Sequence, residues 1–268
     1  MSEFLKYLII GIIQGITEPL PISSSGHILI AQHFFQLPQI DYSLSIFLHG
    51  ASLLAILVLF RKNIVYLLKA NIDYVIKQDK SKEEEFYYAL FLLAALIPGV
   101  IAGLLLKDFI ETRLMGLATI GLALLITGVF LILVQRFSLE NTKARIGLLD
   151  AIIIGLVQVL ALLPGISRSG VTVVGGLFRK LEFEKVVEFS FMLFVPITLG
   201  SLVLEVFSVK EVNHALIPLA AGFIASGVLT YYALKTFIVL VKRGQLKYFS
   251  VYCFAMGGFL VVYSMIFL

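Results

Sequence analysis

The chain has 268 residues, of which 60% are hydrophobic and only 14% are charged. A soluble domain carries roughly 25% charged residues, so this composition excludes an ordinary soluble fold and indicates an integral membrane protein. The net charge of +4 is therefore expected to mark orientation in the bilayer rather than binding to nucleic acid. The single cysteine, Cys253, excludes an intrachain disulfide.

Two apolar segments of the chain, residues 4–17 and 146–163, each run into a cluster of Pro, Ser and Gly. A shorter apolar stretch follows each cluster, so we predict two re-entrant helical hairpins, over 4–35 and 146–178. Pro and Gly end helices, and non-helical backbone inside a membrane is tolerated only where protein buries it or where it lines a wet cavity. Three apolar spans of about 20 residues follow each hairpin. These six spans are predicted at 43–60, 86–106, 114–134, 186–206, 215–234 and 248–268.

The two clusters read as copies of one another. Residues 11–26 align with 155–170 without a gap, and the polar residues among the identities argue against chance convergence of apolar sequence. The identical pairs are Gly11/Gly155, Gln14/Gln158, Ile22/Ile166, Ser23/Ser167, Ser25/Ser169 and Gly26/Gly170. We therefore predict an all-α polytopic membrane protein with one membrane domain, 1–268, built from two repeats, 1–135 and 146–268.

The distribution of basic residues predicts how the repeats are oriented. Three spans after each hairpin is an odd number, so the second repeat must be inverted relative to the first. If residues 61–85 are cytoplasmic, the outer side holds only four basic residues, Lys6, Lys107, Arg113 and Lys210, and apart from Arg168 all the others are cytoplasmic. In inverted repeats, two broken elements meet near the midplane and form the binding site.

The first cluster carries groups suited to catalysis. Gln14 and Glu18 share one helical face, and a carboxylate inside a membrane marks a functional site by default. Ser23, Ser24, Ser25 and Gly26 offer hydroxyls and backbone N–H groups at the start of a helix, where phosphate binds. His27 follows in the first turn and can act as acid, base or nucleophile.

The second cluster carries a cation in the equivalent place. Arg168 occupies the position of Ser24, and its planar fork matches phosphate oxygens. Ser167, Ser169 and Thr172 add hydroxyls, while Gly165 and Gly170 let the backbone approach a ligand. Together the two clusters predict a pocket for a phosphorylated group.

Structural roles are the alternatives. Ser23 and Ser25 could be helix caps, His27 a packing residue, and Arg168 a structural partner of Glu18. His49 is left open between lining the pocket and packing helices. Asp150 and Glu188 are expected at cytoplasmic helix ends, and His214 at an interface.

Both clusters resemble the undecaprenyl-pyrophosphate phosphatase family of bacitracin-resistance membrane enzymes. The resemblance rests on Gln14…Glu18, on Pro21-Ile-Ser-Ser-Ser-Gly-His27 and on Pro164-Gly-Ile-Ser-Arg-Ser-Gly-Val-Thr172, and it covers the whole chain. It implies hydrolysis of a C55 polyprenyl pyrophosphate to the monophosphate, which recycles the lipid carrier of cell-wall precursors. It also implies a divalent cation, Mg or Ca, and a bacterial plasma-membrane location with the site opening to the outer face. Membrane lipids are expected partners, and a homodimer is left open.

The resemblance also implies residue roles. Ser24 is the candidate nucleophile, His27 the base, acid or alternative nucleophile, Arg168 the phosphate clamp, and Glu18 a metal ligand or the group that orients the base. The implied substrate-binding residues are Gln14, Ser23, Ser25, Gly26, Ser167, Ser169, Gly170 and Thr172. Many members have glutamate where this chain has Gln14, which removes one anionic metal ligand.

Two other functions were weighed. Lipid phosphatases of the phosphatidic-acid type need an Arg-Pro and a His-x3-Asp after the Ser-Arg; this chain has no Arg-Pro and no histidine between Arg168 and His214. A transporter or flippase for an anionic lipid suits the inverted repeat equally well. The asymmetry between the two clusters favours an enzyme.

Overall fold

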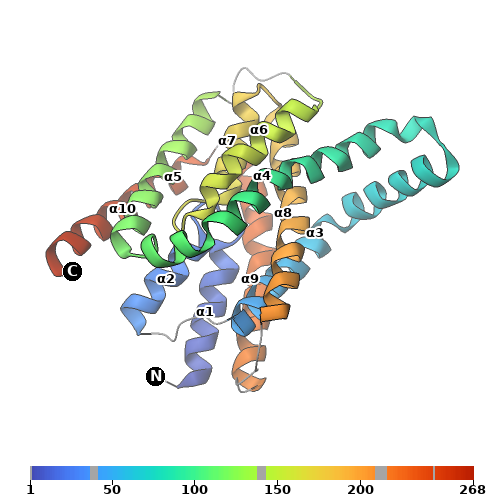
Figure 1. The fold of residues 1–268 in the computed structure, drawn as a ribbon. Helices are drawn as coiled ribbons and strands as arrows, with labels where there is room; N and C mark the ends of the chain where they lie inside the picture. The colour runs from blue at the N-terminus through green and yellow to red at the C-terminus, as the bar shows by residue number, and fades with distance from the viewer. Residues whose placement is uncertain (1, 37–41, 138–142, 209–215, 244) are drawn as a thin grey trace.

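The computed structural model describes residues 2–36, 42–137, 143–208, 216–243 and 245–268, and most of these residues are helical (Figure 1). Lys210 and His214 lie outside these ranges. The helices are α1 (Glu3–Thr17), α2 (Ser24–Phe35), α3 (Tyr42–Lys77), α4 (Glu83–Arg113), α5 (Leu117–Phe137), α6 (Leu148–Gln158), α7 (Arg168–Phe178), α8 (Phe183–Ser208), α9 (Leu216–Lys242) and α10 (Lys247–Phe267), with the 3-10 turns η1 (Lys80–Lys82) and η3 (Val159–Leu162).

Among the described residues, six helices are long and apolar enough to cross a membrane: α3, α4, α5, α8, α9 and α10. Their outward side chains include Leu105, 77% exposed, and Phe207, 84% exposed, which water would not favour. The prediction of a polytopic, all-helical membrane protein with six full spans is therefore confirmed.

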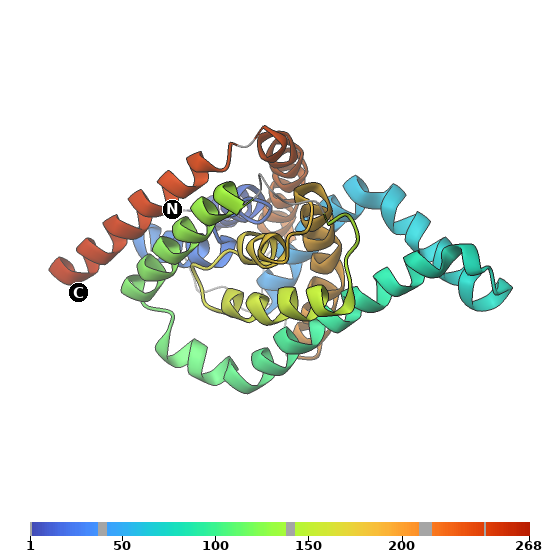
Figure 2. The same cartoon turned by 90° about the horizontal axis from the view of Figure 1, so that it is seen from above.

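The helix that contains the first predicted span is longer than that span. α3 continues without interruption to Lys77, and α4 already begins at Glu83. Residues 61–77 contain no Pro or Gly, so the charges of Arg61 and Lys62 end the apolar pattern without ending the helix. The α3–α4 pair extends away from the rest of the molecule (Figures 1 and 2), and Tyr74 stacks on Phe86 with ring centroids 4.5 Å apart.

The four shorter helices form two pairs that approach the centre from opposite ends. In Figure 1, α1 and α2 have their outer ends at the bottom, and α6 and α7 have theirs at the top. The Pro/Ser/Gly breaks lie at the inner ends of both pairs, between Thr17 and Ser24 and between Leu162 and Arg168. The sequence positions of both breaks were thus predicted closely.

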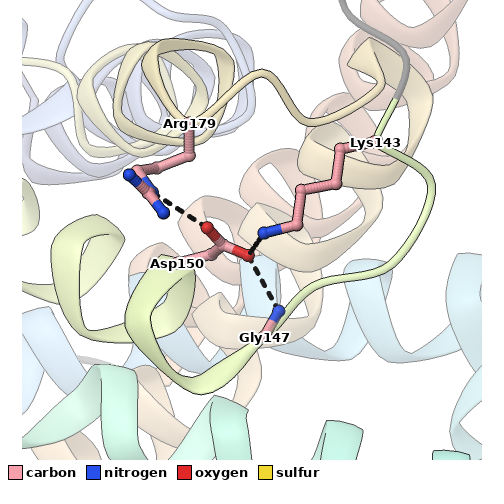
Figure 3. A network of polar contacts seen from close by, with 4 residues as sticks. All are labelled: Lys143, Gly147, Asp150 and Arg179. Carbon is pink, nitrogen blue, oxygen red and sulfur yellow. Dashed lines mark hydrogen bonds and ion pairs between the residues drawn. The ribbon is translucent and has the colours of Figure 1, made fainter.

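The outer end of the α6–α7 pair is fixed by Asp150 (Figure 3). Its carboxylate accepts a 2.9 Å bond from Arg179 Nε at the end of α7 and a 2.9 Å bond from the Gly147 N–H before α6. Lys143 Nζ also pairs with it. As expected, Asp150 lies at a helix end, and it joins the point where α6 begins to the point where α7 ends.

The two halves of the chain pack on each other. α1 lies against α9, α4 against α6, α3 against α8 and α5 against α10. Gly11 permits the first contact, because a Cβ there would lie 2.3 Å from Gly222 O, and Gly155 permits the second, because a Cβ would lie 2.4 Å from Ala95 O. Gly11 and Gly155 are equivalent positions of the sequence repeat.

Candidate functional site

The break between α1 and α2 positions the first cluster. Gln14 Nε2 donates a 2.9 Å bond to Glu18 Oε2, as expected from their shared helical face. Ser24 Oγ donates a short hydrogen bond to the same carboxylate oxygen. A hydroxyl bonded to a carboxylate can transfer its proton there, which is the arrangement that activates a serine nucleophile.

Ser23 is the N-cap of α2 and also joins the two clusters. Its Oγ accepts a 3.4 Å bond from the Gly26 N–H and a 3.0 Å bond from the Gly165 N–H of the second break. Its backbone has φ 69°, a left-handed conformation that costs energy for a residue with a Cβ. The capping role that was an alternative for Ser23 is therefore present, together with a contact between the clusters.

The second cluster repeats this geometry at the start of α7. Ser167 is the N-cap, its Oγ accepts a 3.2 Å bond from the Gly170 N–H, and it lies 3.2 Å from Ser169 Oγ. The Ser23–Ser25 pair is built in the same way, at 3.3 Å. Thr127 of α5 holds the break, since its Oγ1 donates to Gly165 O at 2.9 Å.

A small cavity of about 90 Å³ lies where the clusters meet. The inner ends of both helix pairs contribute to it, with α3 and α8 closing the sides. Its polar lining consists of Glu18, Ser23, Ser24, Ser25, His49, Ser167, Arg168, Ser169 and Ser190. The structure therefore brings the predicted nucleophile, carboxylate and cation around one cavity.

Arg168 is placed to bind an anion. Its guanidinium carbon lies 5.2 Å from the centre of the Phe194 ring, and its Nη1 is buried with no hydrogen-bond partner among the described residues. No ion pair joins it to Glu18, and the structure describes both side chains, so the alternative of a structural pair finds no contact. A buried, unsatisfied guanidinium donor is costly unless a ligand supplies the acceptor.

His27 is held away from the cavity lining. Its Nδ1 lies 2.7 Å from Ser23 O, and its Nε2 lies 2.6 Å from Tyr252 Oη. The carbonyl oxygen of Ser23 can only accept a hydrogen bond, so Nδ1 of His27 carries the proton. In neutral His27, Nε2 therefore has no proton and accepts a hydrogen bond from the hydroxyl of Tyr252. The imidazole that does line the cavity is that of His49.

The other predicted site residues do not line the cavity, and most of them form hydrogen bonds to residues that do. Gly26 and Gly170 donate their N–H groups to the caps, and Thr172 Oγ1 lies 2.6 Å from Ser190 Oγ. Gln14 is buried and its Oε1 has no partner among the described residues. Sequence reasoning missed Thr127, Ser190 and Tyr252, although a hydroxyl within an apolar span was an available signal for the first two.

The residues around Glu18 supply few metal ligands. No group of three or more His, Cys, Asp or Glu side chains that could hold a metal occurs among the described residues. Glu18 and the amide oxygen of Gln14 are oxygen ligands of the kind that Mg²⁺ and Ca²⁺ accept. This set fits a cation that takes most of its ligands from water and a bound phosphate.

Comparison with known proteins identifies the family of the chain. Residues 7–259 match the family model described as bacitracin resistance protein BacA. The chain is 38% identical over 269 residues to undecaprenyl-diphosphatase 2 of Bacillus thuringiensis (strain Al Hakam), covering 98% of this chain and 100% of the relative. It is 40% identical to undecaprenyl-diphosphatase 1 of Halalkalibacterium halodurans, covering 98% and 96%. The chain therefore belongs to the bacitracin resistance protein BacA family.

Proposed function

We propose that this protein hydrolyses undecaprenyl pyrophosphate to the monophosphate and phosphate, and so recycles the lipid carrier of cell-wall synthesis and confers bacitracin resistance. The proposal rests on one arrangement: Ser24, hydrogen-bonded to Glu18, lines the same cavity as Arg168. The buried Nη1 of Arg168 has no hydrogen-bond partner among the described residues. The names of the relatives supply the substrate.

The chemistry follows from these contacts. Ser24 Oγ attacks the terminal phosphorus as its proton passes to Glu18, and the bridging P–O bond breaks so that the lipid monophosphate leaves with the electron pair. Glu18 gives this proton to the departing monophosphate and is a carboxylate again. Water then attacks the phosphoserine as Glu18 takes a proton from it, the bond between phosphorus and Ser24 Oγ breaks, and inorganic phosphate departs as Glu18 returns the proton to Ser24 Oγ. Arg168 and the N–H groups at the start of α2 and α7 stabilise the negative oxygens, which is where most phosphoryl-transfer catalysis lies.

In this proposal His27 positions Ser24, whereas the family resemblance implies a proton-transfer role for it. The hydrogen bonds of His27 to Ser23 O and Tyr252 fix the first turn of α2, which begins at Ser24. A Mg²⁺ or Ca²⁺ ion, held by Glu18, Gln14 and the substrate, would neutralise phosphate charge.

An apolar groove beside the cavity offers a binding site for the lipid tail. An apolar groove of about 490 Å³ lies between α4 and the α6–η3 segment, and Ile97, Leu156 and Val159 are among its lining residues. The short turn η3 contributes Val159 to this groove and Ala161 to the polar cavity. The headgroup could thus occupy the cavity while prenyl units lie in the groove.

The same proposal includes the membrane arrangement. The α1–α2 and α6–α7 pairs are re-entrant hairpins of an inverted repeat, and the site opens to the outer face. Two observations support the repeat: Gly11 and Gly155 make equivalent close contacts with the opposite half, and Ser23 and Ser167 cap equivalent helices. Asp150, which joins the two ends of the second pair, supports entry and exit at one face. The excess of basic residues around 61–85 supports the orientation.

Phosphate release from undecaprenyl pyrophosphate in detergent tests the function. We expect Ser24→Ala and Arg168→Ala each to lose activity by about 100-fold or more, because one removes the nucleophile and the other the phosphate clamp. Ser201→Ala, on an exposed position of α8, is the matched control and should retain activity. Full activity in both Ser24→Ala and Arg168→Ala would contradict the proposed function.

A liposome assay separates the enzyme from a flippase for the same lipid. Translocation of the lipid without phosphate release would support the carrier, whereas release that depends on Ser24 supports the hydrolase.

A further inference from the structure

One side of α3 is apolar and open from Leu54 to the last turn of the helix. Leu54 and Val58 lie on this side within the membrane span and are 53% and 51% exposed, so they face the hydrocarbon of the bilayer. Beyond Arg61 the same side continues with large apolar side chains that are 48% to 73% exposed: Val65, Leu68, Ile72, Val75 and Ile76. Their spacing of three or four residues places them on one helical face, and they are called the apolar stripe below.

Charged residues mark the level at which α3 leaves the hydrocarbon core. Arg61 and Lys62 are both exposed, and they follow an uncharged segment, 43–60, that is about as long as a bilayer core requires. Charged side chains are costly at the centre of a bilayer, so this pair of residues lies near the headgroups. The apolar stripe therefore begins where the membrane core ends.

The other faces of this part of α3 have different surroundings. One face packs on α4, where Tyr74 stacks on Phe86. A second face carries the charged residues Lys69, Asp73 and Lys77, and Lys77 pairs with Asp73 at 2.6 Å. This part of α3 is thus amphipathic, and the described part of the chain leaves its apolar face open.

The direction of the α3–α4 pair keeps the apolar stripe beside the membrane. In Figure 1 α8 and α9 stand upright, and the α3–α4 pair reaches sideways from them both in this view and in Figure 2, which is turned by 90°. A pair that continued along the bundle axis would leave the membrane directly. A pair that runs across the axis stays close to the bilayer surface along its length.

We propose that the apolar stripe binds the surface of the lipid bilayer. The stripe lies among the outer segments of the acyl chains, while Lys69, Asp73 and Lys77 lie in the aqueous headgroup layer, which is how amphipathic helices bind membranes. Lipid fits better than a second protein because the stripe continues the lipid-facing side of the same helix. Contact with the bilayer would also fix the direction of α3, which contributes His49 and Ile56 to the candidate active-site cavity.

Tryptophan fluorescence in vesicles tests this contact, because the sequence contains no tryptophan and one introduced residue is a unique reporter. Leu68→Trp and Val75→Trp place the reporter on the apolar stripe. The matched controls, Lys69→Trp and Lys77→Trp, place it on the charged face of the same helix. The full chain is reconstituted in phosphatidylcholine vesicles with or without bromine on the acyl chains. Bromine quenches indole within the bilayer, whereas acrylamide quenches it from water.

We expect Leu68→Trp and Val75→Trp to lose most of their emission in brominated vesicles, to emit at shorter wavelength than the controls and to resist acrylamide. The two controls should be quenched by acrylamide and lose little emission to bromine. Protection of the buried Cys253 thiol from a thiol dye shows that each variant is folded. None of these measurements depends on hydrolysis of a substrate.

Three results would overturn the proposal. Strong acrylamide quenching of both stripe variants would place the stripe in water. Protection of both from bromine and from acrylamide would show that protein covers the stripe, for example a second copy of this chain. Equal bromine quenching of the stripe variants and the controls would place the whole helix within the hydrocarbon core rather than at its surface.

Discussion

Tyr252 Oη lies 2.6 Å from His27 Nε2, and the two rings stack with centroids 5.5 Å apart. The contact joins the last helix of the chain to the first turn of α2, across 225 positions of sequence. Because His27 also bonds the carbonyl of Ser23, α10 helps to hold the strained turn that presents Ser24.

The Tyr252→Phe variant removes this hydroxyl and keeps the stacked ring. We expect kcat to fall about tenfold, which corresponds to roughly one lost hydrogen bond in the transition state, with KM nearly unchanged. Steady-state phosphate release measures both constants. Tyr248→Phe, an exposed position on the same helix, is the control, and a normal kcat in Tyr252→Phe would show that the contact does not act on catalysis.

The Glu18→Gln variant tests which group receives the proton of Ser24. Glutamine keeps the size of the side chain but cannot accept that proton, so we expect kcat to fall by about 100- to 10,000-fold. Binding of the lipid to the variant, measured by equilibrium retention, should weaken far less. Substantial turnover by Glu18→Gln would assign the proton to another group, with His27 the first to examine.

The close helix contacts at Gly11 and Gly155 predict that a larger side chain at either position destabilises the protein. Gly11→Ala and Gly155→Ala each place a methyl group against backbone of the opposite half, so we expect each to lose about 1–3 kcal/mol of stability. The buried thiol of Cys253, the one cysteine in the sequence, reports unfolding through its reaction with a thiol dye. Gly258→Ala is the control, since nothing lies within 4 Å of a Cβ there, and equal stability of all three variants would contradict the prediction.

We expect removal of the Asp150 charge to lower the stability of the protein more than removal of a surface ion pair does. Asp150→Asn removes the charge that Lys143 and Arg179 share, and the buried position leaves little water to replace it, so we expect a loss of about 1–3 kcal/mol. Asp73→Asn removes the partner of Lys77, a side chain that is 70% exposed, and should change stability much less, because water and salt screen a surface ion pair. The same Cys253 assay compares them, and a smaller effect at Asp150 than at Asp73 would refute the prediction.

Much of this fold could be predicted because lipid imposes strong rules on sequence. Long apolar segments identified the six spans, and the Pro/Ser/Gly breaks located the starts of α2 and α7. The capping bonds of Ser23 and Ser167 follow from local spacing, since a hydroxyl three residues before a glycine N–H suits a helix N-terminus.

The rest depends on contacts between distant segments. The contacts of Tyr252 with His27 and of Thr127 with Gly165 arise from how α5 and α10 pack. The hydroxyl of Thr127 within an apolar span could have marked that residue, but not its partner. The continuation of α3 to Lys77 does not follow from the apolar pattern, because charged residues end an apolar run without ending a helix. His49 was left open for the same reason as Tyr252: its neighbours lie on other helices.

The bond from the Gly165 N–H to Ser23 Oγ has a consequence for how the protein matures. Ser24, the proposed nucleophile, is synthesised in the first tenth of the chain, but its supporting turn receives this bond only after the second half has been inserted and docked. A partly inserted chain therefore carries Ser24 and Glu18 without Arg168, and with an unsupported turn. Hydrolytic competence thus arises at the last stage of assembly, and the enzyme cannot attack its lipid before both halves are in place.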